Sequence, residues 1–306
     1  MKNYRKLLAG SLALLFAVGI TGCSNTSGGG TGVANEDGLV VLNVASTGQP
    51  VSFDPADANL VVNEYTEYDC YDTLLDFNQD GTDVVPALAE SWGQVADLTY
   101  TYKIREGVKF SDGSDLTMDD VLYSLNRVRE DAYGMSYLFE HVDSFEVDEK
   151  TRTLTVHLTQ PDSTWKYVPA TTPCQILKKS VVEAEGDAYG TNEGSVVGTG
   201  PYKFVSWAAD SQIVLEKNEY WWGGADNLAI DKINFFVMKD ASTIALAVKS
   251  GTIDFAPGIT NDVLPTYESL SNYNIIHDFE TSTVFVALNT QVAPFDDVNA
   301  RKALAY

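Results

Sequence analysis

Apolar runs alternate with amphipathic runs along the chain from residue 39 onward, and no segment repeats another. The mostly apolar residues 39–46 predict a strand that is buried on both faces. Alternation of Tyr100, Tyr102 and Ile104 predicts a second strand, and residues 144–161 predict a hairpin-like pair of strands. Strands and helices thus alternate, and the pattern predicts an α/β fold with mixed sheets.

Spacings of three and four residues between apolar positions predict the helices. Residues 63–77 fit a helix whose tyrosines lie in the core and at its rim. The clearest helix follows Thr117, because Asp120 completes a capping box in which Asp replaces the usual Glu. Its apolar stripe consists of Met118, Val121, Leu122, Leu125 and Val128. Another helix is predicted to begin after the N-cap Asp240 and to end before Gly251 at the C′ position.

The beginning of the chain has the organisation of an export signal. Basic residues precede an apolar run at 7–19, which is shorter than the roughly 18 to 20 residues that a transmembrane helix needs. The sequence ITGC then resembles the lipobox of bacterial lipoproteins, which predicts a lipoprotein signal peptide at 1–22 and lipidation of Cys23. An ordinary cleaved signal with an incidental Cys is the alternative. The polar, glycine-rich residues 23–38 predict a flexible tether, so we expect an exported protein, lipid-anchored to the outer face of the cell membrane or in the periplasm.

Composition and charge narrow the class of protein. With 44% hydrophobic and 11% aromatic residues the chain is globular, and 306 residues suffice for two domains. A formal net charge of −23 repels phosphate backbones, so no nucleic-acid partner is expected. The acidic surface could attract cationic ligands such as peptide amines, or it could provide solubility alone.

Motifs for catalysis or metal binding are incomplete. Residues 76–87 begin like a calcium loop, but Ala87 stands where a bidentate glutamate is needed, so a turn is predicted instead. Ser163 and Lys166 match S-x-x-K without the K-T-G or S-D-N element that accompanies it. The three histidines are far apart in the sequence. We therefore predict no enzyme, no cofactor and no metal site, although an exported hydrolase built on two of the 43 acidic residues, or a structural envelope lipoprotein, stays open.

Two cysteines follow Cys23 in the chain. Cys70 lies in a helix-like run, and Cys174 follows a proline in a predicted loop. An exported protein could pair them in a disulfide. Two separately buried thiols are the favoured interpretation.

Eight phrases occur in an order that matches a known family. They are VVPALAESW (84–92), TYKIREGVKFSDGS (101–114), LTMDDVLYSLNRV (116–128), VGTGPYKFVSW (197–207), EYWWGG (219–224), DKINFFVMKDAST (231–243), KSGTIDFA (249–256) and PFDDVNARKALAY (294–306). From about residue 39 to its last residue, the chain thus closely resembles the family 5 extracellular solute-binding proteins of ABC importers, the oligopeptide, dipeptide and nickel binders.

The resemblance implies a periplasmic-binding-protein-like clamshell of type II with two lobes and a subdomain inserted in lobe I. Residues 39–80 and 190–280 would form the core of lobe I, 81–189 the inserted subdomain, and 281–306 the start of lobe II. The family continues further, whereas this chain stops at Tyr306 within a predicted helix. We therefore expect a C-terminally truncated chain from which most of lobe II is missing.

The resemblance also implies a ligand site and partners. The loop after the first strand matches the cleft-lining segment of the family, and the crossover between lobes lies near the hinge. The implied ligand-binding residues are Ser46, Thr47, Gly48, Gln49, Thr281, Ser282, Thr283 and Phe285. A monomer would bind a di- or oligopeptide and deliver it to an ABC permease and ATPase complex, without covalent chemistry; nickel or an oligosaccharide is the alternative ligand.

The phrase at 197–207 is interpreted as a joint between the inserted subdomain and lobe I. Gly198 and Gly200 would permit positive φ angles, and Pro201 would begin a strand without needing its N–H. No group in this phrase suits catalysis.

Overall fold

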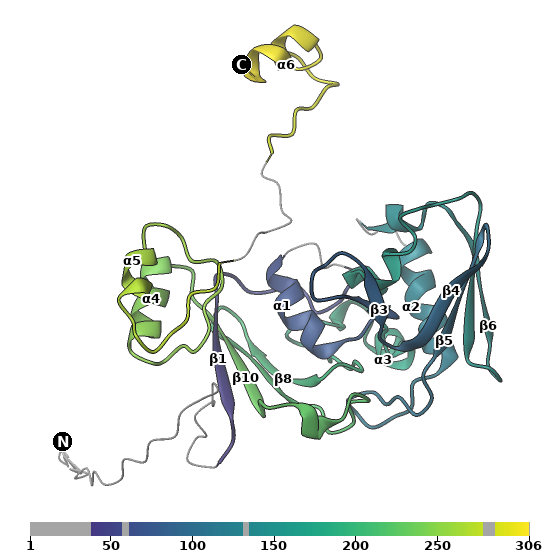
Figure 1. Ribbon diagram of the computed structural model, residues 1–306, viewed down its shortest axis with the longest axis horizontal. Coiled ribbons are helices and arrows are strands. Elements are labelled where there is room, and N and C mark those ends of the chain that lie inside the picture. Colours follow the sequence, from purple (N-terminus) through teal and green to yellow (C-terminus); the bar gives the residue numbers. More distant parts are fainter. Residues whose placement is uncertain (1–37, 57–60, 131–134, 278–284, 306) are drawn as a thin grey trace, which may run out of the picture.

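The computed structural model describes residues 38–56, 61–130, 135–277 and 285–305, and its body contains two four-stranded sheets (Figure 1). The first has the strand order β1-β10-β9-β8. Its strands are β1 (Val41–Ser46), β8 (Tyr202–Ala208), β9 (Gln212–Lys217) and β10 (Lys232–Val237). β1 and β10 run parallel, while β9 is antiparallel to both β8 and β10, so this sheet is mixed, as predicted.

The second sheet is antiparallel and has the order β4-β5-β7-β6. Its strands are β4 (Ala89–Ala96), β5 (Thr99–Ile104), β6 (Val142–Asp148) and β7 (Thr153–Leu158), and the pair β6-β7 confirms the predicted hairpin. Alternate residues of β5 and β7 are buried, and they share one core with Met118, Val121, Leu125 and Val128 of helix α2 (Met118–Glu130). Leu122, the remaining residue of the predicted stripe, is only half-buried and lies outside this core. Burial of the other four residues holds the helix against the sheet.

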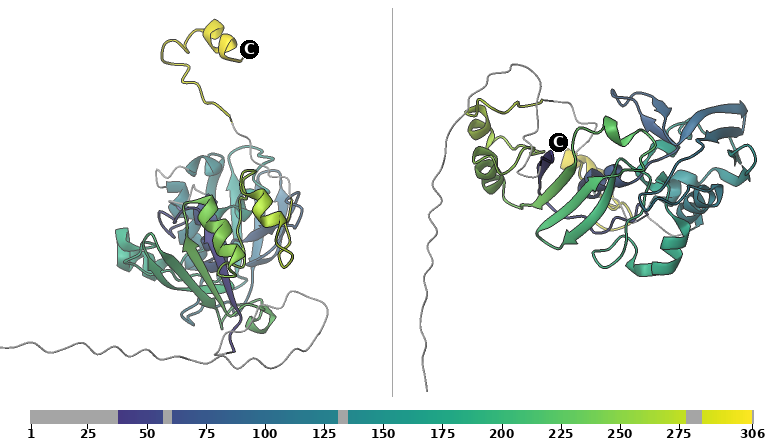
Figure 2. Two further views of the ribbon diagram at one scale, coloured as in Figure 1. Left: turned by 90° about the vertical axis from the view of Figure 1, so that its left-hand side faces the viewer. Right: turned by 90° about the horizontal axis from the view of Figure 1, so that it is seen from below.

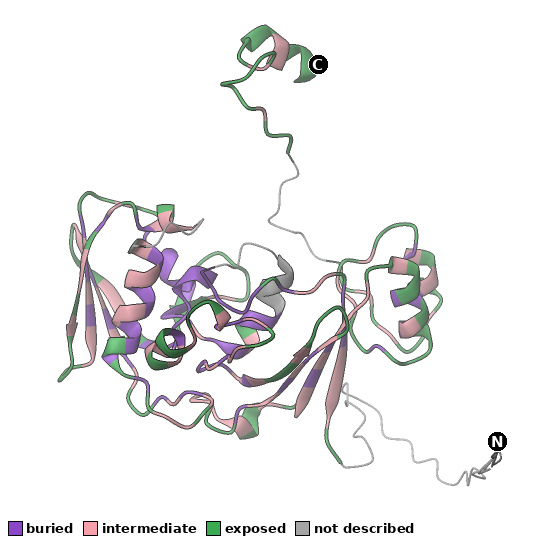
Figure 3. Cartoon of the chain, turned by 180° about the vertical axis from the view of Figure 1, so that it is seen from behind, coloured by how far each residue is buried: buried purple, intermediate pink, exposed green. Residues whose placement is uncertain are grey.

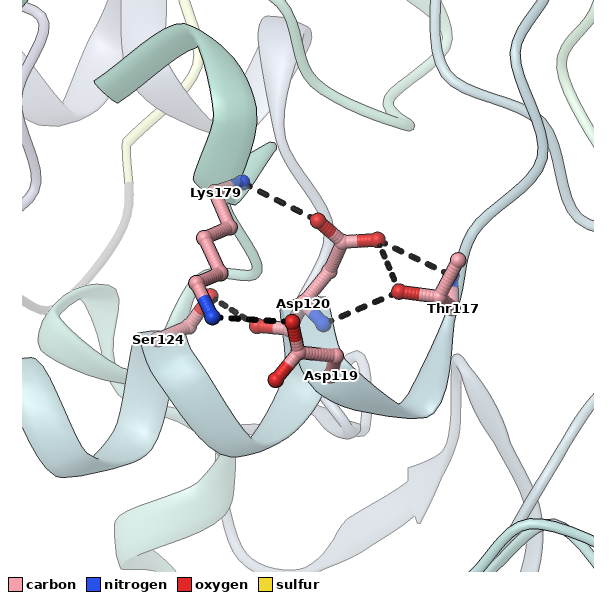
Figure 4. A network of polar contacts seen from close by, with 5 residues as sticks. All are labelled: Thr117, Asp119, Asp120, Ser124 and Lys179. Atoms are coloured by element: carbon pink, nitrogen blue, oxygen red, sulfur yellow. Dashed lines mark hydrogen bonds and ion pairs between the residues drawn. The ribbon is translucent and has the colours of Figure 1, made fainter. Parts of the chain in front are cut away.

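Helix α2 begins with the predicted capping box, shown in Figure 4. The Thr117 N–H donates to Asp120 Oδ2 at 3.0 Å, and the Asp120 N–H donates to Thr117 Oγ1 at 3.1 Å. The other carboxylate oxygen of Asp120 accepts the N–H of Lys179 at 3.0 Å, at the start of helix α3 (Lys179–Glu185). One carboxylate therefore caps two helices whose starts are distant in the sequence.

Helix α1 (Val61–Cys70) is shorter than predicted. It ends at Cys70, and residues 75–77 belong instead to strand β2 (Leu75–Phe77). The reason is competition for backbone groups, because the Cys70 carbonyl accepts the N–H of Gly200 at 3.0 Å and the Asp72 carbonyl accepts the N–H of Ile176 at 2.9 Å. Tertiary partners therefore replace the bonds that would continue the helix.

The joint at 197–207 works differently from the prediction. Neither Gly198 nor Gly200 has a positive φ, so that part of the prediction is wrong. Both instead lie against the end of α1, where a Cβ on Gly198 would stand 2.1 Å from the Cys70 carbonyl oxygen. The absent side chain is needed for close approach of two backbones, and strand β8 then begins at Tyr202.

Helix α4 (Ala241–Lys249) has both predicted ends. Asp240 accepts the N–H of Thr243 at 2.7 Å as its N-cap, and Gly251 has a φ of 77° just beyond the C-cap. Cys70 and Cys174 are buried and free, which confirms two separate thiols. Burial raises the pKa of Cys174 to about 12.

The remaining elements are short. They are β3 (Val84–Pro86), α5 (Leu264–Glu268), α6 (Val298–Ala305) and the 3-10 helices η1 (Ser136–Phe139), η2 (Val168–Ala170), η3 (Thr172–Cys174), η4 (Gly186–Ala188) and η5 (Ala225–Asn227). Of the residues 76–87 that were predicted to form a turn, only 78–83 lie between the strands β2 and β3, which form a hairpin. Helix α6 has no buried residue and lies apart from the body in Figure 1 and in the left view of Figure 2. Figure 3 shows its exposed residues beside the buried residues of the body.

All strands of the first sheet fall within the ranges predicted for the core of lobe I, and all strands of the second within 81–189. The domain boundaries themselves stay a prediction. Within the described ranges, no helix is both long enough and apolar enough to cross a membrane.

Candidate functional site

The carboxyl ends of β1 and β10 meet at one edge of the first sheet. Ser46 pairs with Val237 there, and the Met238 N–H donates to the Ser46 carbonyl at 2.8 Å. The turn between β8 and β9 reaches the same edge, because Gln212 pairs with Phe236. We call this region the carboxyl edge: residues 47–51 after β1, 208–211 between β8 and β9, and 238–240 after β10. Ligands of α/β sheets bind outside the carboxyl ends of the strands.

The loop at 47–51 carries free backbone donors. No described residue accepts a hydrogen bond from the N–H groups of Thr47, Gly48 or Gln49. Thr47 and Val51 are exposed, whereas Gly48 and Gln49 are half-buried. Three consecutive donors can bind carbonyl or carboxylate oxygens of a ligand.

Two side chains shape this loop. The hydroxyl of Ser46 donates to the Gly48 carbonyl at 2.6 Å, so its proton is already used within the chain. The side-chain oxygen of Gln49 accepts the N–H of Asp210 at 2.6 Å, which ties the loop to the turn between β8 and β9. The amide nitrogen of Gln49 remains available as a donor.

The predicted site residues are brought together only in part. Ser46, Thr47, Gly48 and Gln49 are contiguous at the carboxyl edge. Phe285 is 77% exposed in the segment that precedes α6. The predicted residues Cys23, Thr281, Ser282 and Thr283 lie outside the described residues.

Other residues of this region were not predicted from the sequence. Asp210 adopts a φ of 54° in the turn and pairs with Lys239 at 2.8 Å. Phe255 is half exposed, and its carbonyl accepts the N–H of Ala45 at 2.9 Å, next to β1. These contacts join residues that are far apart in the chain, so no local sequence pattern predicts them.

A hollow of about 270 Å³ lies at the opposite edge of the same sheet. It is lined by Leu39, Lys203, Glu216, Lys217, Asp231 and Lys232. Lys217 contacts Asp231 at 2.7 Å, and the neighbouring Lys203 contacts Glu219 at 2.7 Å. Because these lysines are already paired, the hollow is a poor anion site.

A buried carboxyl group lies beside the joint at 197–207. Asp72 Oδ2 accepts hydrogen bonds from Thr199 Oγ1 and Trp222 Nε1, both at 2.8 Å. Burial raises the pKa of Asp72 to about 7, although these two bonds oppose the rise. Burial also raises the pKa of Asp69, on the neighbouring turn of α1, to about 7. The described residues contain no group of three His, Cys, Asp or Glu side chains that could hold a metal ion.

Comparisons with known proteins agree on one family. A family model described as bacterial extracellular solute-binding proteins, family 5 middle, matches residues 83–306. The dipeptide-binding protein DppE of Bacillus subtilis is 28% identical over 328 residues, which cover 100% of this chain and 59% of DppE. The oligopeptide-binding protein OppA of Bacillus subtilis is 27% identical over 320 residues, 97% of this chain and 58% of OppA.

Solved structures show the same similarity. The oligopeptide-binding protein AppA of Bacillus subtilis, in complex with a nonapeptide, has a TM-score of 0.77 and 26% identity, covering 86% of this chain and 53% of AppA. The chain thus spans between half and three-fifths of the length of these proteins. The similarity confirms the predicted α/β fold of the periplasmic-binding-protein type.

Proposed function

Because the chain belongs to the bacterial extracellular solute-binding proteins of family 5, we propose that it is the substrate-binding component of an ABC importer and that its ligands are di- and oligopeptides. It captures the peptide outside the membrane and delivers it to a permease and ATPase complex. Relatives named as dipeptide-binding and oligopeptide-binding support this choice of ligand.

One observation on this chain carries the proposal: at the carboxyl edge, no described residue accepts a hydrogen bond from the N–H groups of Thr47, Gly48 or Gln49. Every peptide offers carbonyl oxygens and a terminal carboxylate, whatever its side chains. Backbone donors therefore suit a ligand class whose members share a main chain and differ in everything else. The net charge of −23 adds a general attraction for the peptide amine.

The proposed mechanism is capture by closure. The peptide binds between two lobes, rotation about the hinge traps it, and the closed form docks on the permease, while the peptide is left chemically unchanged. Thr281, Ser282, Thr283 and Phe285 are proposed to contact the ligand from the hinge side. A lipid on Cys23 and the tether at 23–38 would keep this monomer close to the membrane that holds the permease.

A thermal-shift screen of the complete gene product tests the proposal. We expect di- to pentapeptides to raise the melting temperature, whereas nickel chelates and oligosaccharides leave it unchanged. A shift with nickel or an oligosaccharide alone would replace peptide as the ligand class. No shift with any ligand would favour a structural envelope lipoprotein, and peptide turnover would favour a hydrolase.

A matched pair of variants tests the site. Gln49→Glu keeps the acceptor for the Asp210 N–H but removes the amide donor and adds a negative charge next to the free N–H groups. We expect about tenfold weaker peptide binding, which corresponds to about 1.4 kcal/mol. Gln94→Glu makes the same change on the exposed strand β4 and serves as the control. Equal affinities of the two variants would contradict the site.

A further inference from the structure

Among the ion pairs of the described residues, that of Arg127 and Asp54 has the least exposed side chains. Arg127 Nη1 donates to Asp54 Oδ1 at 2.6 Å, and Nη2 donates to Asp54 Oδ2 at 2.5 Å. The Arg127 side chain is 13% exposed and that of Asp54 is 7% exposed, whereas the other ion pairs of these residues are more open. The fork geometry fixes both the distance and the angle between the two groups.

Burying two charges is a costly way to gain stability. The desolvation of a buried pair offsets much of its attraction, and apolar residues of similar volume often stabilise a fold as well or better. What such a pair adds is a defined geometry, because each charge must meet its partner. The question is then which part of the molecule is held in place.

Asp54 fixes the far end of the ligand loop. Its Oδ1 also accepts the N–H of Ala56 at 3.1 Å, and its own N–H donates to Ser52 Oγ at 2.9 Å. The preceding Phe53 is fully buried and donates its N–H to the Gly190 carbonyl at 2.7 Å. Residues 52–56 are thus a rigid anchor.

The near end of the loop is fixed by the strand β1 and by the bond between Gln49 and the Asp210 N–H. Residues 47–51 lie between strand β1 and the anchor at 52–56, and among them are the three residues whose backbone N–H groups no described residue accepts. A loop held at both ends presents its donors without paying the ordering entropy when the ligand binds.

Arg127 comes from a different part of the molecule. It lies on α2, whose apolar stripe packs against the second sheet, whereas Asp54 follows the first strand of the first sheet. Beside the pair, the hydroxyls of Tyr71 and Tyr189 are 2.8 Å apart, and Gly190 follows Tyr189. The pair therefore joins the unit of the second sheet to the ligand loop.

We infer that Arg127 is a positioning residue for peptide binding: through Asp54 it holds the loop at 47–51 in the conformation that binds the ligand. This inference rests on the proposed function of the loop. It assigns to the inserted unit a part in ligand affinity, although Arg127 contacts Asp54 rather than the loop itself and need not touch the ligand.

The test compares two variants of the complete gene product. Arg127→Lys keeps the charge and loses the fork, and Val156→Ala removes apolar volume from the buried core of β7 without touching the loop. Asp54→Asn is a second variant of the pair, in case Arg127→Lys folds poorly. Urea denaturation first establishes that the variants compared have similar stability.

Two measurements, both made under conditions where the variants are folded, then test the inference. Thermolysin, which cleaves before apolar residues, reports without any ligand the order of the loop at Val51 and of the adjoining anchor at Phe53. Fluorescence titration with trialanine reports affinity. We expect Arg127→Lys to be cut at least tenfold faster in this loop than Val156→Ala, and to bind trialanine at least tenfold more weakly. Equal cleavage, or faster cleavage with unchanged affinity, would overturn the inference. If the wild type binds no peptide, the proposed function fails, and the cleavage rates still decide whether Arg127 orders the loop.

Discussion

Replacing Gly198 by Ala tests the close approach between the joint at 197–207 and the end of α1. A Cβ at this position would lie 2.1 Å from the Cys70 carbonyl oxygen and 2.5 Å from the ring of Tyr71. The first contact is with backbone, which has no rotamer that relieves it. The two segments must therefore separate by about an ångström, since heavy-atom contacts below 3.0 Å are essentially never found.

The magnitude follows from what this separation breaks. Overpacking a tight interior costs about 1 to 3 kcal/mol. Two hydrogen bonds of the joint are also strained, from Gly200 N–H to the Cys70 carbonyl and from Ser111 N–H to the Gly198 carbonyl, at about 1 kcal/mol each. We expect Gly198→Ala to lower the free energy of unfolding by about 3 to 5 kcal/mol.

Urea denaturation followed by circular dichroism measures this loss. Gly93→Ala is the matched control, because a Cβ on Gly93 meets no atom within 4 Å and its φ is not positive. That substitution should change the free energy of unfolding by less than about 1 kcal/mol, in the stabilising direction. A Gly198→Ala variant as stable as Gly93→Ala would refute the close-approach argument.

Two further predictions concern buried polar groups. Burial raises the pKa of Asp72 from 3.8 to about 7, so between these two pH values the folded state holds a proton that the unfolded state has lost. The free energy of unfolding therefore falls as the pH rises from about 4 to about 7, by up to about 1.4 kcal/mol per pH unit. Asp69 has its pKa raised to about 7 as well, so the two carboxyl groups contribute about equally to this pH dependence. Asp72→Asn should therefore roughly halve the slope of the urea midpoint against pH. An unchanged slope would contradict the raised pKa of Asp72. Neither amide atom of the buried Gln175 side chain has a hydrogen-bond partner among the described residues, so Gln175→Met should be neutral or stabilise by about 1 to 3 kcal/mol in thermal unfolding. A clear loss of stability would show that the amide is satisfied.

Sequence patterns within a few residues correctly predicted the helix ends whose hydrogen bonds join neighbouring residues. The capping box at Thr117 and the N-cap at Asp240 act within one turn of helix, so a few neighbouring residues specify them. The helix at 63–77 was predicted too long because its apolar spacing continues past Cys70. Its end is set by Gly200 and Ile176, which are more than a hundred residues away in the chain.

In the candidate site, too, some residues could be predicted from the sequence and others could not. Residues 46–49 were found through the resemblance to the family. The structure adds that no described residue accepts the backbone N–H groups of Thr47, Gly48 and Gln49, which no side-chain pattern encodes. Asp54 and Arg127 form the bidentate ion pair at the end of the loop, yet no sequence pattern distinguishes either of them from other charged residues. Their pairing depends on how α2 packs, which the sequence of either segment does not contain.

If main-chain N–H groups hold the ligand as proposed, ligand preference and the capacity to bind a peptide main chain can change independently. In the proposed binding mode, substitutions at the exposed position 47 can alter which ligand is preferred, whereas every residue except proline keeps the backbone N–H donor there. Under the proposed function, a duplicated gene could therefore acquire a new ligand preference by single substitutions that each retain peptide binding.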